Sequence, residues 1–245
     1  MHAGKAYFIC FTVRSGSTLL SQLLADTGLA GRPKEHFYHN ISPDNPRGDA
    51  IPDYRAYLEQ ILAADTSANG VFGSKVGGGY WRDFARRLRS IEGFDSLPLK
   101  AALDRLFPDL RYLHLTRRSK VRQAVSHWMA IQTGRWSSLD TVENSTPRYD
   151  FAAIDHLLQE IMIREAVWAE YFAENSIQPY GIIYEEFVAH PAATVRAVLD
   201  CLDIERPTDF KVPAPRYQRL SNALTEAWVQ RFRQEKQRDF WTQFW

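Results

Sequence analysis

A short polar loop follows the first apolar stretch of the chain, and its residue types suit the binding of an anion. Gly16 lets the backbone approach a ligand closely, and Arg14 adds a planar positive charge. Ser17 and Thr18 place hydroxyls beside the unpaired N–H groups of an expected helix start, where the helix dipole also attracts anions. We interpret the loop as a phosphate cradle for a nucleotide-like ligand. The alternative is a strand that ends in an ordinary Ser/Thr helix cap.

The loop differs from the Walker A motif, G-x-x-x-x-G-K-[ST]. Phe11 stands where that motif has its first Gly, and Ser17 stands where it has Lys. The sequence therefore predicts phosphate binding without the usual handling of ATP or GTP.

A second group of basic and hydroxyl side chains lies later in the chain. Arg117 and Arg118 follow an apolar stretch, and Arg122 and Ser126 are four residues apart, so they share a helix face. A guanidinium and a hydroxyl together can hold a separate phosphate. The alternative is a solvated basic helix start.

Strands and helices alternate along the sequence. Strands are expected at 6–12, 70–76, 111–116 and 178–184, and helices at 17–27, 54–64, 80–90, 99–107, 120–133, 154–175, 192–202 and 222–244. This order predicts an α/β fold, a P-loop-like three-layer sandwich with a central, mostly parallel sheet and helices on both faces. Ligands of such sheets bind at the carboxyl ends of the strands, where the first loop, Lys75 and Arg117/Arg118 all fall.

The composition fits one domain, residues 1–245, with polar insertions near 32–53 and 137–148. The hydrophobic content of 45% is ample for a core, and the net charge of +1 argues against a general nucleic-acid partner. Cys10 and Cys201 are expected to be buried free thiols rather than a disulfide or a metal site. No signal peptide and no stretch long enough for stable membrane insertion is recognised, so a cytoplasmic protein is expected.

Five stretches of the chain, in the same order, resemble the PAPS-dependent sulfotransferases. Within these enzymes they are most similar to the bacterial Stf0-type (trehalose 2-sulfotransferase-like) branch. The similar stretches are 12–20, 28–37, 72–75, 114–136 and 216–232, and the third reads Phe72-Gly73-Ser74-Lys75. The R-S-G-S-T loop is shared by many sulfotransferases. Its combination with Ala-Val-Ser-x-Trp and a Glu beyond the first helix is specific.

The resemblance implies a donor, a catalytic base and no metal. The loop residues Arg14, Ser15, Gly16, Ser17 and Thr18 would bind the 5′-phosphosulfate of 3′-phosphoadenosine 5′-phosphosulfate (PAPS). Ser126, with either Arg117 or Arg118, would hold the 3′-phosphate. Glu35 matches the family's acidic residue and would take the proton of the attacking hydroxyl, with His36 as the next candidate.

The acceptor implied by the resemblance is a carbohydrate or glycolipid hydroxyl. Candidate residues lining its site are Lys75, Trp81, Trp128, Gln132 and Trp136. For Trp128 and Trp136 the alternative is a place in the core, and for Lys75 it is a charge at the surface. Two other functions remain open on the sequence: a P-loop-like nucleotide kinase and a non-catalytic nucleotide-binding protein.

Four aromatic residues near the C-terminus form one stripe on the last expected helix: Phe240, Trp241, Phe244 and Trp245. They either pack on their own domain or form a subunit interface. The resemblance is compatible with a homodimer.

Overall fold

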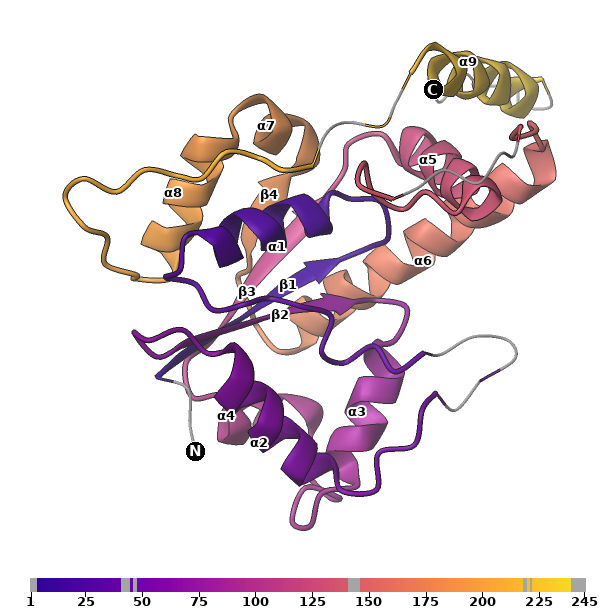
Figure 1. Ribbon diagram of the computed structural model, residues 1–245. Helices are drawn as coiled ribbons and strands as arrows, with labels where there is room; N and C mark the ends of the chain where they lie inside the picture. The colour runs from indigo at the N-terminus through magenta and orange to yellow at the C-terminus, as the bar shows by residue number, and fades with distance from the viewer. Residues whose placement is uncertain are drawn as a thin grey trace.

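The fold is built on a four-stranded sheet in the order β2-β1-β3-β4, in which every strand pairing is parallel (Figure 1). The computed structural model describes residues 4–40, 45, 48–140, 146–217, 220 and 222–238. The strands are β1 (Lys5–Phe11), β2 (Val71–Gly77), β3 (Leu110–Thr116) and β4 (Tyr180–Ile183). The helices are α1 (Ser17–Asp26), α2 (Tyr54–Asp65), α3 (Trp81–Arg89), α4 (Leu99–Leu106), α5 (Lys120–Thr133), α6 (Phe151–Glu174), α7 (Tyr184–Ala189), α8 (Pro191–Cys201) and α9 (Ala223–Gln237).

The alternating side chains of β1 build the core on both faces of the sheet. Phe8 and Cys10 belong to one apolar cluster, together with side chains of α2, α3, α4 and α6. Tyr7 and Ile9 belong to another, with side chains of α1, α7 and α8. Because successive strand residues point to opposite faces, a strand buried on both sides needs a continuous apolar run. The predicted three-layer sandwich is thereby confirmed (Figure 1).

A third apolar cluster joins α5, α6 and α9 beside the sheet. Val125 of α5, Leu158 of α6 and Phe232 of α9 are all buried in it. This cluster brings the C-terminal helix against α5, although about ninety residues of chain separate them (Figure 1). The pairing matters for the site, because α5 carries several of the predicted binding residues.

Most elements lie within a few residues of their predicted bounds, with three corrections. The last helix, predicted to reach residue 244, ends at Gln237. The predicted strand 178–184 ends at Ile183, and a short helix, α7, starts directly at Tyr184. The helix predicted from Ile154 begins at Phe151, because the Asp150 side chain caps it by accepting the backbone N–H of Ala153. The C-terminal aromatic stripe at 240–245 lies outside the described residues.

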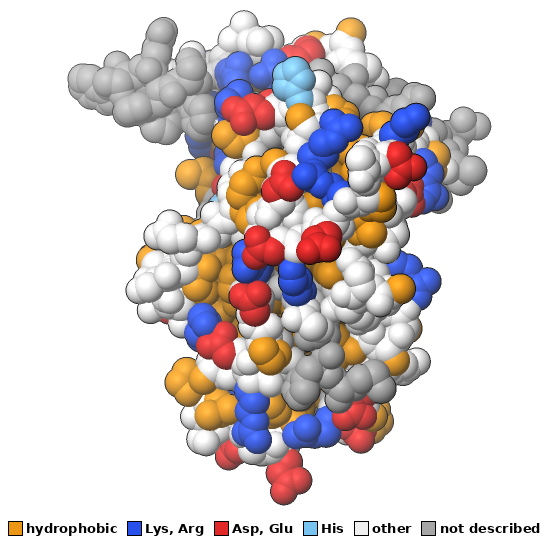
Figure 2. Space-filling model, turned by 90° about the vertical axis from the view of Figure 1, so that its left-hand side faces the viewer, with side chains coloured by type: hydrophobic (Ala, Val, Ile, Leu, Met, Phe, Trp, Pro, Cys, Tyr) orange, Lys and Arg blue, Asp and Glu red, His pale blue; other side chains and the backbone are white. Residues whose placement is uncertain are grey.

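Charged side chains of both signs are interspersed on the face seen in Figure 2. Among the helices that the structure describes, none combines the length and apolar character needed to cross a membrane.

Candidate functional site

The carboxyl ends of the strands border a cavity of about 1030 Å³. Its lining includes the loop after β1, Lys75 of β2, Arg117 after β3 and Tyr184 after β4. The prediction that the first loop, Lys75 and an arginine after the third strand meet at one edge of the sheet is confirmed. The volume lies at the upper end of the usual range for ligand sites, about 300–1,000 Å³.

The loop after β1 has the backbone of an anion cradle. Arg14 and Gly16 adopt left-handed conformations, with φ values of 63° and 94°, and the N–H of Ser15 donates to the carbonyl of Thr12 at 3.2 Å. Gly16 is the N-cap of α1, and no side chain caps the helix there. A Cβ on Gly16 would lie 2.5 Å from the ring of Tyr184. The first N–H groups of α1 are therefore available to a ligand, and only glycine fits at the turn.

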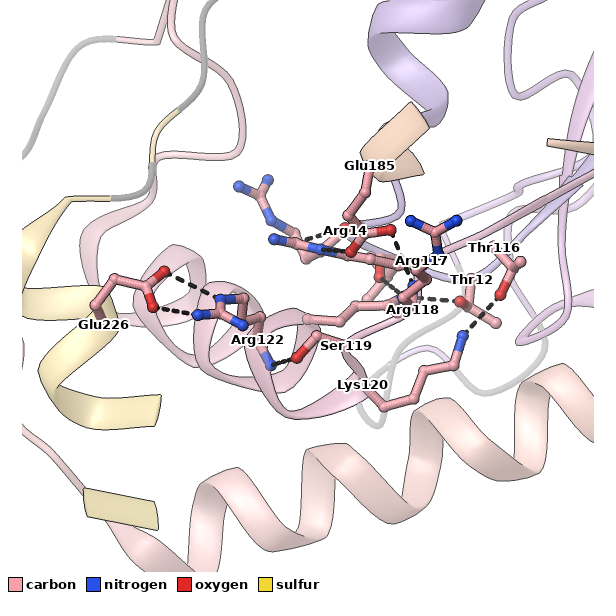
Figure 3. Close-up of polar contacts among 12 residues, drawn as sticks. Thr12, Arg14, Thr116, Arg117, Arg118, Ser119, Lys120, Arg122, Glu185 and Glu226 are labelled. Carbon is pink, nitrogen blue, oxygen red and sulfur yellow. Dashed lines mark hydrogen bonds and ion pairs between the residues drawn. The ribbon is translucent and has the colours of Figure 1, made fainter. Parts of the chain in front are cut away.

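Arg14 and Arg117 come close together at this loop (Figure 3). The Arg14 Nε donates to the Ser126 Oγ at 3.1 Å, and one of its terminal nitrogens donates to the carbonyl of Trp136. The Arg117 guanidinium lies 4.6 Å from the centroid of the Tyr184 ring. Burial, followed by the charge of Arg117, lowers the pKa of Arg14. Two guanidinium groups held close together in a partly buried site make this part of the cavity favourable for negatively charged groups.

Arg117, rather than Arg118, belongs to the cavity. Arg117 is 7% exposed, lines the cavity, and lies 3.6 Å from the Oε1 of Glu185 through its Nε. Arg118 is not part of the lining, since its side chain is 59% exposed and pairs with Glu186. The sequence left these two arginines undecided because both follow the same strand.

Not all of the predicted loop residues Ser15, Ser17 and Thr18 reach the cavity. Ser17 and Thr18 line the cavity, whereas Ser15 is fully buried behind it. The Ser15 hydroxyl has no hydrogen-bond partner among the described residues. Ser15 is therefore part of the loop, but its side chain does not line the cavity.

Glu35 and Lys75 form an ion pair at the cavity wall, with 3.2 Å between Oε1 and Nζ. Lys75 is 9% exposed and its Nζ lies 5.6 Å from the centroid of the Phe11 ring, so it is not the surface charge that the sequence left open. The pair provides a proton acceptor and a cation next to the anion cradle.

His36 lies outside the cavity. Its Nδ1 is 3.0 Å from the Ser74 Oγ, and its Nε2 is 2.9 Å from the Asp65 Oδ2. Burial lowers its pKa most, and the nearby Asp65 carboxylate opposes that effect. With both ring nitrogens engaged away from the lining, His36 is not placed to act on a ligand in the cavity.

Of the other predicted acceptor residues, only Trp136 lines the cavity. Trp81 is 5% exposed and packs in the core against Trp168, with 4.7 Å between ring centroids. Trp128 and Gln132 instead donate to the carbonyl of Arg148, at 2.9 and 3.0 Å. They secure the chain that returns from the polar insertion to α6, and the lining does not include them.

The structure adds Tyr184, Glu185 and Glu226, which the sequence did not indicate, and shows the partner of Arg122, which the sequence had grouped with Ser126. Tyr184 and Glu185 line the cavity directly after β4. Ligands of parallel sheets bind at the carboxyl ends of the strands. A strand predicted to end at Ile183, rather than at residue 184, would therefore have pointed to both residues. Arg122 and Glu226 line the cavity as a doubly hydrogen-bonded pair between α5 and α9 (Figure 3). No sequence signal announces that pair, because it depends on how α9 packs.

Among the residues that the structure describes, no three His, Cys, Asp or Glu side chains gather as a set of metal ligands.

Comparison with known proteins places this geometry in a family. The chain is 30% identical to trehalose 2-sulfotransferase of Mycobacterium tuberculosis (strain ATCC 35801 / TMC 107 / Erdman), over 96% of this chain and 97% of the relative. It is 27% identical to trehalose 2-sulfotransferase of Mycolicibacterium smegmatis (strain ATCC 700084 / mc(2)155), over 96% of each.

The fold is also similar to solved structures. A sulfotransferase from Alicyclobacillus acidocaldarius aligns with a TM-score of 0.53 at 19% identity, covering 97% of this chain and 98% of that one. The sulfotransferase domain of the Synechococcus PCC 7002 olefin synthase aligns with a TM-score of 0.51 at 14% identity, covering 95% and 88%. The family match runs from residue 6 to residue 235, and the chain therefore belongs to the Stf0 sulphotransferase family and is an enzyme of the sulfotransferase class.

Proposed function

We propose that this enzyme transfers a sulfuryl group from PAPS to a hydroxyl of a carbohydrate acceptor, with Glu35 as the general base. One observation carries the proposal: an anion cradle and a carboxylate–ammonium pair line the same cavity. The two curated relatives are named for trehalose, so a trehalose-type disaccharide is the acceptor to test first.

The residues present fit a donor with two phosphate groups. The start of α1, where Gly16 is the N-cap and no side chain caps the helix, offers backbone donors. Arg14, Ser17 and Thr18 would hold the 5′-phosphosulfate at this point. Arg117 and Ser126, which also line the cavity, would hold the 3′-phosphate.

The carboxylate and the two cations divide the chemistry between them. In the transfer, the S–O bond to the 5′-phosphate breaks while a new S–O bond forms to the acceptor oxygen, leaving a sulfate ester and 3′-phosphoadenosine 5′-phosphate (PAP). Glu35 takes the proton from the attacking hydroxyl, a step typically contributing about 10²–10⁴-fold. Arg14 and the N–H groups of α1 stabilise the negative charge on the departing phosphate oxygen. Lys75 holds the Glu35 carboxylate in place.

Two measurements test the function. PAP is expected to raise the melting temperature far more than ADP or GDP, because only PAP carries the 3′-phosphate. Incubation with [³⁵S]PAPS and a panel of sugars that includes trehalose is expected to yield a labelled sulfate ester. Equal stabilisation by the three nucleotides would contradict the donor. Labelled product on glycolipids alone would reject free disaccharides as acceptors.

A further inference from the structure

The segment that carries Glu35 meets the outer edge of β2 at a bridge. Lys34 forms a parallel bridge with Ser74, and the N–H of Lys75 donates to the Lys34 carbonyl at 2.8 Å. Hydrogen-bonded turns flank this bridge on both sides. In this conformation Arg32, Lys34 and His36 reach a carboxylate of α2, while Glu35 meets Lys75 at the cavity wall.

These three side chains all reach one carboxylate, that of Asp65. Arg32 Nε lies 2.8 Å from its Oδ1, Lys34 Nζ 2.9 Å from the same oxygen, and His36 Nε2 2.9 Å from its Oδ2. The Asp65 side chain is only 5% exposed, and it ends α2, on the face of the sheet that α2 covers (Figure 1). The backbone N–H of Arg32 also donates to the Asp65 carbonyl, at 2.9 Å.

The contacts around Asp65 favour the negatively charged carboxylate that binds these three side chains. Burial acts to raise its pKa, but the hydrogen bonds from Lys34 and His36 outweigh burial, so its pKa is below the ordinary value. A second contact between α2 and this segment is a hydrogen bond that the Tyr57 hydroxyl donates to the carbonyl of His36. Two positions of α2, Asp65 at its end and Tyr57 in its first turn, thus hold the segment on both flanks of Glu35.

We propose that Asp65 is a positioning residue for the transfer reaction: by binding Arg32, Lys34 and His36 it fixes the backbone on both sides of Glu35 and directs Glu35 into the cavity. The inference rests on the proposed role of Glu35 as base. Asp65 does not line the cavity and touches no reacting group. Its effect is geometric, and a displacement of about 1 Å at a reacting group can lower the rate by about 10²-fold.

The test compares Asp65→Asn with Glu35→Gln and with the double variant, using PAPS and trehalose or, if trehalose is not sulfated, the best sugar of the panel. Asp65→Asn is expected to lower kcat by about ten- to a hundredfold. Its Kd for PAP, measured by calorimetry, should stay within about twofold, since the anion cradle belongs to other elements. Adding Asp65→Asn to Glu35→Gln should cost nothing further, because the positioned group is already disabled.

Two further variants control for folding. Asp53→Ala removes the cap of the same helix, where the Asp53 side chain accepts the N–H of Ala56 at 2.9 Å, and should lower Tm without lowering kcat at 25 °C. Lys34→Met removes one of the contacts of Asp65, and the Lys34 side chain is 63% exposed. This variant should therefore fold even if Asp65→Asn does not, and it should lose part of kcat. In a crystal structure of either Asp65→Asn or Lys34→Met, the Glu35–Lys75 contact of 3.2 Å should be broken.

The outcomes separate the two ideas. A normal kcat for Asp65→Asn and Lys34→Met beside an inactive Glu35→Gln overturns the positioning role alone. Additive losses in the double variant overturn it too, because Asp65 would then act by another route. A normal kcat for Glu35→Gln overturns the base assignment, and the positioning role falls with it.

Discussion

At the scale of single residues, the proposed function predicts that Arg117 distinguishes nucleotides by their 3′-phosphate. Arg117→Ala is expected to weaken PAP binding by about 1.5–3 kcal/mol, the range for a hydrogen bond to a charged group, and 5′-AMP binding much less. Calorimetry with both nucleotides measures the difference. Arg118→Ala is the matched control, since its exposed side chain pairs with Glu186. A selective loss in Arg118→Ala, with none in Arg117→Ala, would reverse the assignment.

Gly16 is required for two separable reasons, its backbone conformation and its contact with Tyr184. Gly16→Ala puts a Cβ 2.5 Å from the Tyr184 ring at a φ of 94°. Gly28→Ala meets nothing within 4 Å at a φ of 69°. Both should lose about 1–2 kcal/mol of stability from the left-handed backbone. Only Gly16→Ala should lose more, together with PAP affinity. Chemical denaturation and calorimetry would show this, and equal effects of the two variants would contradict it.

At the scale of elements, Glu165 of α6 ties the ends of two strands to the helix that follows the second. It accepts from Thr12 at 3.2 Å, from Thr116 at 3.0 Å and from Lys120 at 2.5 Å. Glu165→Gln should lower the free energy of unfolding by about 1–3 kcal/mol, because the partly buried donors lose a charged acceptor. Glu170→Gln, on the exposed part of the same helix, should change it little. Denaturation curves that coincide for the two variants would contradict this role.

At the scale of the whole molecule, the free energy of unfolding should depend on pH through His127. Burial, followed by the charges of Arg164 and Arg14, lowers the pKa of His127 from 6.5 to about 4. The unfolded chain therefore binds a proton below about pH 6.5 that the folded chain does not bind until about pH 4. Because the unfolded state then binds more protons, the free energy of unfolding falls as the pH is lowered through this window.

The measurement is a series of urea denaturations between pH 7 and pH 4. The slope contributed by one such group approaches about 1.4 kcal/mol per pH unit. His127→Gln should flatten the profile, whereas His156→Gln, at an exposed position of α6, serves as the histidine control. An unchanged profile in His127→Gln would show that other groups cause the dependence.

The local sequence determined the elements and the class of chemistry. The apolar run of β1, followed by a loop with Arg14 and Gly16, identifies a strand, a cradle and a helix start within fifteen residues. Such features depend on neighbours in the chain and on backbone preferences, so they can be read without the fold. The resemblance to sulfotransferases rests on the same short stretches, and the family match bears it out.

Tertiary structure decided which side chains face the ligand. Arg117 and Arg118 are adjacent in sequence, yet only the contacts with Tyr184 and Glu186 place one inside the cavity and the other outside. His36 and Asp65 meet because α2 ends beside the edge of β2. Direction, burial and partners of this kind arise from packing between segments far apart in the chain. The sequence therefore determined the fold class and the anion-binding loop, and the packing decided how the cavity around that loop is lined.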